Sequence, residues 1–539
     1  MPSSNTEQLS TTTPAQPSSR AGGVTLAALL IGGLALRLFH AGYRFLNADE
    51  VLHYILSVQK SFSATYGASL TTAHPPLLII FLHYWGMLGH SELFLRLPSV
   101  LAGTGFCWVM YRWLRLVVDE ATARLALTLL LFSPALILLS AEVRQYALLL
   151  LFSSLSLYFL ESAIQRSSVL RAMLSAVALY LALLTHYSSF IVALTLGIYG
   201  LLRFVSVRSR FAVFATWIAG QLGALGLVSF LFVTHISKLE TRGAAESIAE
   251  SYLRRSVFQP GENHVLTFIA RSNLRLFHYF FSQGAVGVLA LLLFVVGAYF
   301  LFRDRKREQD SRPPSWQFAS ILVFPLAANC ALAIFRLYPY GGTRHNSYLS
   351  IFVFPAIAVA ITRWKPQWRP QKLTAVALVL AVCNLFPAPI GEYIHLRDQN
   401  RLRMAEAVKS LQRIPAGSVI FTDDQGGLLL SYYLCNQRVV QIENPQPFLN
   451  APCGRVSVVS IDPREWIFKA GTFGHQLRDA QQTYQWNDRT TLWFFQAGWF
   501  IDKESALREE LRQYGCVPGG EYGHNITLCQ LKLGITRPD

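Results

Sequence analysis

Long apolar runs that recur along most of the chain constrain its fold more than any other feature. We place about eleven of them, each close to the roughly 17–25 residues that cross a bilayer as a helix. They lie near residues 22–40, 93–117, 121–140, 145–163, 170–185, 188–204, 211–234, 284–302, 317–335, 347–362 and 372–390. Only 14% of the 539 residues are charged, whereas a soluble domain carries about 25%. The sequence therefore predicts an α-helical polytopic membrane protein.

Basic residues mark one side of the predicted membrane. The net charge of +16 is compatible in principle with a nucleic-acid partner, but the basic side chains punctuate the apolar runs and occupy alternate loops. These loops hold Arg112 and Arg115; Arg166 and Arg171; Arg203, Arg208 and Arg210; Arg303, Arg305, Lys306 and Arg307; and Arg363, Lys365, Arg369 and Lys372. By the positive-inside rule they are cytoplasmic, and we expect no nucleic-acid partner.

Composition divides the chain into three parts. Residues 1–20 are rich in Ser, Thr, Pro and Gln, which is typical of a disordered tail and here predicts a cytoplasmic one. Residues 21–390 form the predicted transmembrane domain, with a long first outer loop at 41–92. Residues 391–539 are charged and alternate helical patterns with strand patterns near 418–422, 455–461, 491–495 and 525–529. This alternation predicts an α/β domain, which eleven spans place outside the cytoplasm.

Four of the 7 cysteines lie in the predicted α/β domain. An even number suits disulfides in an oxidising compartment, and four cysteines allow three pairings. We favour Cys435–Cys453 and Cys516–Cys529, because these pairs are closest in sequence. The spacing does not match a zinc site.

Polar residues that could carry chemistry all fall in the predicted outer loops. They are Asp49 and Glu50; His74; Glu142, Arg144 and Tyr146; His186 and Tyr187; and Arg344 and His345. Each also has a structural interpretation: a helix cap for the carboxylates, snorkelling for the arginines and an interfacial aromatic belt for the tyrosines. The chain has no phosphate-binding glycine loop, nucleophile elbow or dinucleotide fingerprint.

The order of these motifs resembles a known family. Asp49-Glu50, His74-Pro-Pro-Leu77, Glu92 to Pro98, Glu142 to Ala147, Thr185-His-Tyr187 and Arg344-His345 together resemble the family 39-like GT-C glycosyltransferases of the protein O-mannosyltransferase and lipid A aminoarabinose transferase superfamily. The resemblance covers roughly residues 22–390. It implies transfer of a monosaccharide, with inversion, from a polyprenyl-phosphate donor to a protein, lipid or glycan acceptor. It further implies a site on the outer face of a bacterial inner membrane.

The resemblance also implies roles for individual residues. Asp49 matches the general base that removes a proton from the acceptor, and Glu50 is a weaker catalytic candidate that orients the acceptor or tunes Asp49. Arg144 and Arg344 are candidates for stabilising the departing phosphate. His345 accompanies Arg344 as a substrate-binding candidate.

The remaining candidates have less specific roles. Glu142 and Tyr146 are four residues apart and would share a face if both were helical, where they could contact a cation or the acceptor. His186 could bind a divalent metal together with an acidic residue, with Tyr187 beside it. His74 precedes two prolines, so we interpret it chiefly as shaping the loop.

Two other function classes stay open from the sequence. One is a transporter or flippase of lipid-linked sugars, which would usually show internal repeats and polar residues near mid-membrane; neither is recognisable here. The other is a non-catalytic envelope assembly protein whose function lies in residues 391–539.

The alternation of basic loops predicts topology directly. Single cysteines placed at Arg305 and in the 391–539 domain should label from opposite sides of the membrane, with Arg305 inside. Labelling of both from the same side would show that the predicted number of spans is wrong.

Overall fold

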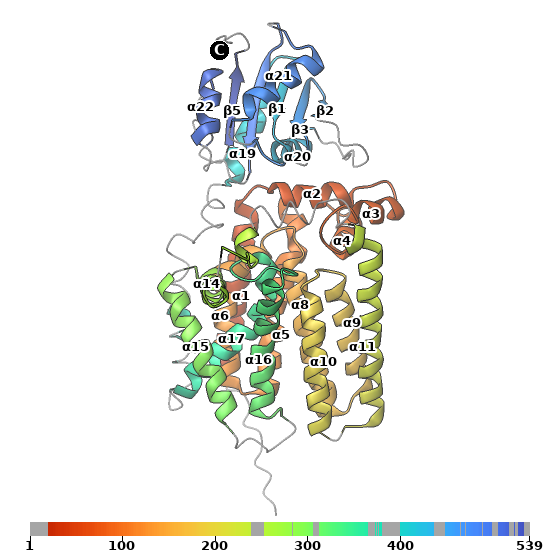
Figure 1. Cartoon of the computed structure of the whole chain (residues 1–539), viewed down its shortest axis with the longest axis vertical. Helices are drawn as coiled ribbons and strands as arrows, with labels where there is room; N and C mark the ends of the chain where they lie inside the picture. Colours follow the sequence, from red (N-terminus) through yellow and green to blue (C-terminus); the bar gives the residue numbers. More distant parts are fainter. Residues whose placement is uncertain are drawn as a thin grey trace, which may run out of the picture.

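The molecule consists of a helical membrane part with an α/β domain on top of it (Figure 1). This computed structural model describes residues 20–207, 209–238, 253–262, 264–282, 284–304, 312–364, 372, 374–375, 377–379, 399–435, 448–463, 465–468, 471–487, 489–498, 505–516, 522 and 526–532. The predicted tail before Arg20, most of the predicted span at 372–390 and the start of the predicted α/β domain at 391–398 lie outside these residues.

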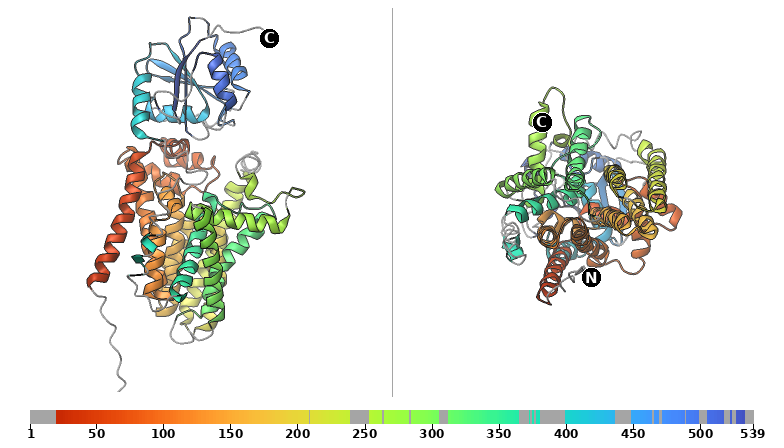
Figure 2. Two further views of the ribbon diagram at one scale, coloured as in Figure 1. Left: turned by 90° about the vertical axis from the view of Figure 1, so that its left-hand side faces the viewer. Right: turned by 90° about the horizontal axis from the view of Figure 1, so that it is seen from below.

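Apolar helices form the membrane part. They are α1 (Arg20–Tyr43), α5 (Glu92–Val117), α6 (Glu120–Leu131), α7 (Pro134–Ser140), α8 (Tyr146–Arg166), α9 (Val169–Leu183), α10 (Ser189–Ser206), α11 (Phe211–Leu231), α15 (Gly284–Arg303), α16 (Ser315–Ile334) and α17 (Ser350–Trp364). The more polar α14 (Val265–Phe281), which carries Arg271 and Arg275, packs against α15. Short helices η1 (Phe232–Ile236), η2 (Arg254–Ser256) and η3 (Arg344–Leu349) join them. Seen from the side and from below, α1 lies at the edge of the bundle (Figure 2).

Within the described residues, eight helices are long and apolar enough to cross a membrane, or nine if the bent pair α6 and α7 is one span. This pair bends by 64° at Ser133-Pro134, because a proline has no amide hydrogen and starts a new helix at its first position. The predicted span at 170–185 corresponds to α9, which has only 15 residues. The protein is an integral multi-pass membrane protein, and the predicted total of about eleven spans stays a prediction.

The predicted first outer loop folds into three short helices on top of the bundle (Figure 1). They are α2 (Ala48–Ser57), α3 (Phe62–Ser69) and α4 (Leu77–Trp85). Pro76 immediately precedes α4, and the amide of Leu77 donates to the carbonyl oxygen of Leu184 at 3.0 Å. This bond ties the loop to the end of α9.

The upper domain is a five-stranded sheet with the order β2-β3-β1-β4-β5. Its strands are β1 (Val419–Thr422), β2 (Phe448–Cys453), β3 (Val456–Ile461), β4 (Leu492–Ala497) and β5 (Ile526–Leu531). β1 pairs in parallel with β3 and β4, with Val419 opposite Ser457 and Leu492, whereas both edge strands are antiparallel. The predicted α/β class is confirmed. β2 was not predicted, because Pro452 within it argues against a strand and is tolerated only at a sheet edge.

Helices cover both faces of this sheet. α21 (Phe473–Tyr484) and α22 (Ser505–Gln513) share a core with the face that carries Phe421 and Phe494. α19 (Arg401–Leu411) and α20 (Asp424–Tyr433) share a core with the opposite face and also with α2 of the first loop. The α/β domain is therefore packed directly on that loop.

Both favoured disulfides are present. Cys435–Cys453 joins the end of α20 to β2, and Cys516–Cys529 joins the turn after α22 to β5. Each closes a short loop, of 18 and 13 residues respectively.

Removing the first bridge should destabilise the upper domain. Changing Cys435 and Cys453 together to Ser should cost about 3 kcal/mol of unfolding free energy, the usual value for a loop of this length. Differential scanning fluorimetry of the detergent-purified protein would show this as a lower melting temperature. Cys330→Ser is the matched control, because Cys330 is a free cysteine within the membrane part. An unchanged melting temperature in the double variant would contradict the prediction.

Candidate active site

The site is built around the first turn of α2. The Asn47 side chain accepts from the Glu50 amide at 3.0 Å, and the Glu50 carboxylate accepts from the Asn47 amide at 2.9 Å. This reciprocal capping box follows from an Asn three residues before a Glu. It begins the helix so that Asp49 and Glu50, as neighbours on one helix, diverge by about 100°.

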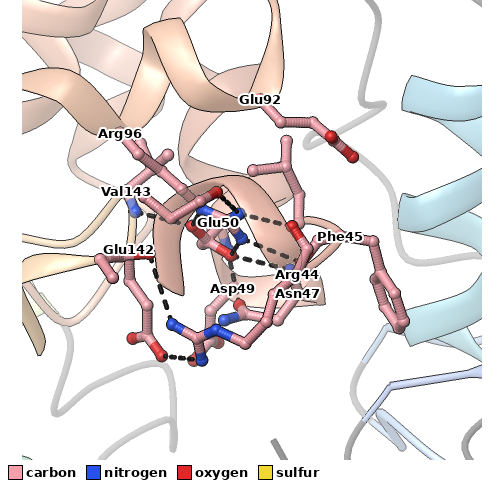
Figure 3. A network of polar contacts seen from close by, with 12 residues as sticks. Arg44, Phe45, Asn47, Asp49, Glu50, Glu92, Arg96, Glu142 and Val143 are labelled. Atoms are coloured by element: carbon pink, nitrogen blue, oxygen red, sulfur yellow. Dashed lines mark hydrogen bonds and ion pairs between the residues drawn. The ribbon is translucent and has the colours of Figure 1, made fainter. Parts of the chain in front are cut away.

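Glu50 turns inward and is completely buried. Arg96 donates hydrogen bonds to both carboxylate oxygens, at 2.7 and 2.6 Å, and the amide of Val143 donates to Oε1 at 2.8 Å (Figure 3). Burial by itself would raise the pKa of Glu50, but the Arg96 charge and the amide donors bring it below its ordinary value. The occupied oxygens favour a positioning role for Glu50 over a catalytic one.

Asp49 turns the other way and keeps 19% of its side chain exposed. Its Oδ2 accepts a hydrogen bond from Arg344 Nη1 at 3.0 Å and forms an ion pair with Arg144 Nη1 at 2.8 Å. Burial raises the pKa of Asp49, but the two arginines outweigh it and bring the pKa to about 2. Oδ1 makes no hydrogen bond to any residue that the structure describes. Asp49 is thus ionised, with one oxygen available to a ligand.

The backbone before Arg344 explains how this arginine reaches Asp49. Gly341 has φ +135°, which side chains rarely allow, and a Cβ on Gly342 would lie 2.4 Å from the carbonyl oxygen of Arg275. Only glycine permits this turn and close approach. The chain then enters η3 with Arg344 as its first residue.

Four imidazoles gather next to this ion-paired carboxylate. Ring centroids are 5.3 Å apart for His74 and His186, 5.7 Å for His186 and His345, and 6.2 Å for His53 and His74. Burial, followed by the Arg144 charge, lowers the pKa of His53 to about 4 and that of His186 to about 3. Burial also lowers the pKa of His74. These three rings are therefore neutral at pH 7.

Three of these rings carry a buried nitrogen that has no hydrogen-bond partner among the described residues, namely His53 Nε2, His74 Nδ1 and His186 Nε2. Such orphaned polar atoms are rare unless a ligand or water satisfies them. Tyr146 completes the group, 5.3 Å from the His186 ring and 5.7 Å from the Arg144 guanidinium. The arrangement is suited to a polar, anionic ligand.

His53 was not among the predicted site residues, although a signal was present. It lies four residues after Asp49, hence on the same face of α2, and its Nδ1 contacts the Asp49 carbonyl oxygen at 2.5 Å. Arg96 and Arg44, which hold the loop, were also missed as functional residues.

Two predicted substrate-binding residues occupy different places from those expected. The Tyr187 hydroxyl pairs with His235 in η1, and His235 Nε2 contacts the Thr72 carbonyl oxygen at 2.8 Å. Through His235, Tyr187 therefore helps to hold the first loop in position. Glu142 does not share a helix face with Tyr146 as expected, because α7 ends at Ser140 and α8 begins only at Tyr146.

Glu142 instead lies in the turn between these helices, 3.6 Å from Arg44 Nη1. Burial raises the pKa of Glu142 above its ordinary value. A role toward the acceptor stays a prediction for this residue.

The residues around His186 fit a divalent metal poorly. Their free nitrogens are suitable donors, but in the described part of the chain no three His, Cys, Asp or Glu side chains converge as an ion requires. Asp49, the acidic residue beside these imidazoles, already forms ion pairs with two arginines. No step proposed below passes through a metal, and metal dependence stays a prediction.

Comparisons with known proteins agree with this architecture. A family model described as dolichyl-phosphate-mannose-protein mannosyltransferase matches residues 73–233, less than half of the chain. The structure resembles ArnT from Cupriavidus metallidurans in the apo state, with TM-score 0.54, 11% identity, and coverage of 95% of this chain and 98% of that one. For the same protein bound to undecaprenyl phosphate, the values are 0.55, 12%, 97% and 100%.

The chain has a GT-C fold. This confirms the predicted fold class, including the α/β domain after the membrane part, because the similarity to ArnT extends over nearly the whole length of both chains. A search of curated proteins gave no match. The matched segment of the family model includes His74, Arg144 and His186 but neither Asp49 nor Arg344.

The low pKa of Asp49 predicts how stability depends on pH. Since the native pKa of about 2 lies below the ordinary 3.8, Asp49 stabilises the folded state by about 2 kcal/mol above that ordinary value, and this is lost as pH falls through 2. The difference in melting temperature between wild type and Asp49→Asn should therefore be constant from about pH 8 to pH 5. A difference that already shrinks between pH 7 and pH 5 would mean that burial prevails and raises this pKa.

Proposed function

We propose that this protein is a membrane glycosyltransferase that transfers a hexosyl or pentosyl unit from a polyprenyl-phosphate donor to an acceptor outside the cytoplasm. The observation that carries this proposal is Asp49, an ionised carboxylate with one free oxygen, held between Arg144 and Arg344 at the edge of the membrane part. The GT-C fold supports it, and so does the undecaprenyl phosphate bound to ArnT, which has the same fold.

Asp49 acts as the base in this proposal. Its Oδ1 accepts the proton of the acceptor as the acceptor oxygen or nitrogen forms a bond to the anomeric carbon. The bond between that carbon and the phosphate oxygen breaks, and the electron pair leaves with the polyprenyl phosphate. One displacement inverts the anomeric configuration.

Arg144 and Arg344 have two tasks that are linked by charge. A carboxylate with a pKa near 2 is a weak base at neutral pH. A donor phosphate would compete for both guanidinium groups, reduce their pull on Asp49 and so raise its pKa toward the ordinary value. The arginines would then stabilise the charge that develops on the leaving phosphate, and donor binding would activate the base.

The neutral imidazoles complete the binding site. His74, His186 and His53 can each donate or accept one hydrogen bond through a nitrogen that has no partner in the structure. They suit phosphate oxygens or sugar hydroxyls, and they add no positive charge that would hold the product phosphate too tightly.

We place the site on the outer face of a bacterial inner membrane. Arg115, Arg166, Arg203, Arg303 and Arg363 lie in the last turns of α5, α8, α10, α15 and α17. Helices α5, α8 and α17 begin next to the site, so their basic ends are on the opposite side. The positive-inside rule makes that side cytoplasmic. Two disulfides in the upper domain agree with an oxidising compartment.

Asp49→Asn tests the proposal. The variant keeps the shape of the side chain but removes the proton acceptor, so turnover should fall about 10²–10⁴-fold while donor binding persists. Release of polyprenyl phosphate from candidate polyprenyl-phosphate sugars measures the rate, and Arg344→Ala should in addition weaken donor binding. Asp119→Asn is the control, because Asp119 caps α6 at the end of the membrane part opposite the site, and Asn caps a helix about as well as Asp.

A folded Asp49→Asn protein that retains more than about a tenth of the wild-type rate would overturn the assignment. Movement of intact lipid-linked sugar across vesicles, with no release of polyprenyl phosphate, would identify a transporter instead.

A further inference from the structure

The bend between α1 and α2 depends on contacts from above and below. Its backbone, Arg44 to Asn47, leads directly to Asp49 and lies outside both helices, with Asn47 as the N-cap of α2. From below, Arg96 donates to the carbonyl oxygens of Arg44 and Phe45 at 2.6 and 2.9 Å. Those bonds satisfy carbonyl groups only, so the amide groups of the bend need other partners.

The α/β domain supplies those partners. The amide of Phe45 donates to the carbonyl oxygen of Gln399 at 3.1 Å, and Arg44 forms an antiparallel bridge with Asn400. The amide of Leu46 donates to the Tyr433 hydroxyl at 2.8 Å. Leu46 is completely buried, so its amide is not left to water.

The Tyr433 hydroxyl donates its own hydrogen to Glu92 Oε1. Glu92 is buried at the start of α5, four residues before Arg96, and its other oxygen pairs with Arg401 Nε at 2.5 Å. A continuous polar chain therefore runs from α20 and α19 through Glu92 to the backbone that precedes Asp49. Tyr433 stands at its centre, because its hydroxyl accepts from the Leu46 amide and donates to Glu92.

Apolar packing keeps this chain in place. α2 and α20 contribute Val51, Tyr54 and Ile55 on one side and Leu428, Leu429 and Leu430 on the other to one hydrophobic core. The rings of Tyr54 and Tyr432 meet edge to face at 5.4 Å. In Figure 1, α20 lies directly over α2.

From these contacts we infer that the α/β domain contributes to the active site by holding its backbone in place. Tyr433 is the positioning residue for Asp49. It acts by fixing the Leu46 amide and Glu92, which set where α2 begins and where Asp49 lies relative to Arg144 and Arg344. This inference rests on the proposed function, since it concerns the base of that reaction. The upper domain then serves the reaction at the membrane surface by positioning Asp49, in place of an independent activity.

Tyr433→Phe in the full-length protein tests the inference. It removes only the hydroxyl, leaves the Leu46 amide and Glu92 without their shared partner, and should lower kcat about 10-fold with little change in the KM for donor, because a small displacement of a catalytic group slows chemistry. Tyr522→Phe is the matched control: it removes a buried tyrosine hydroxyl that bonds Ser410 inside the α/β domain, and its kcat should equal that of the wild type.

A double-mutant cycle separates positioning from general damage. If Tyr433 acts through Asp49, Tyr433→Phe should not lower the residual rate of Asp49→Asn any further. An equal 10-fold loss in both backgrounds would overturn the inference, as would a kcat for Tyr433→Phe within 2-fold of the Tyr522→Phe value. Arg401→Met, which breaks a half-exposed ion pair in the same chain, should lower kcat in the same direction but less, and it serves if Tyr433→Phe fails to fold.

The cycle also distinguishes the two proposals. Failure of the wild type to release polyprenyl phosphate would overturn the proposed function, and full activity of Asp49→Asn would overturn Asp49 as its base. A slow Asp49→Asn beside a normal Tyr433→Phe would overturn the positioning role alone.

Discussion

The buried ion pair of Glu50 and Arg96 is the interaction on which the site depends. Two charges removed from water destabilise a fold unless geometry and hydrogen bonding satisfy both. Here Arg96 uses Nε, Nη1 and Nη2 for Glu50 and for the carbonyl oxygens of Ala41, Arg44 and Phe45. Glu50 also accepts from the amides of Asn47 and Val143. One pair thereby joins α1, α2, α5 and the turn that carries Arg144.

This anchoring explains why two adjacent carboxylates differ so much. Glu50 is fully buried, and both of its oxygens accept hydrogen bonds. Asp49 keeps one oxygen available to a ligand, and its negative charge is balanced by Arg144 and Arg344. Those two arginines come from separate segments and meet on a single oxygen atom of Asp49. In the proposed reaction a donor phosphate replaces this contact, while the buried pair of Glu50 and Arg96 continues to hold the loop. Different surroundings can thus give two neighbouring carboxylates different roles, one structural and one chemical.

The α/β domain belongs to the same arrangement. Its inner helices share a core with α2, and its tyrosine hydroxyls bond the backbone and side chains of the first loop. The Cys435–Cys453 bridge begins two residues after Tyr433 and ties the end of α20 to β2. The disulfide therefore stabilises the element that contacts the bend before Asp49, which links the rigidity of the sheet to the site below it.

Sequence patterns alone predicted the membrane class, the α/β class of the last part and a common location for the polar motifs, and they favoured the disulfide pairs that the structure contains. These follow from apolar run length, charge in loops, periodicity and sequence separation, all of which are local. The three-dimensional contacts were needed to see that Glu50 faces inward, that Tyr187 pairs with His235, that His53 lies beside His74, and that Tyr433 bonds the backbone before Asp49. Each of these depends on the phase of a short helix or turn, which is set by packing between segments that are distant in sequence, 46 residues apart for Glu50 and Arg96 and 387 for Leu46 and Tyr433.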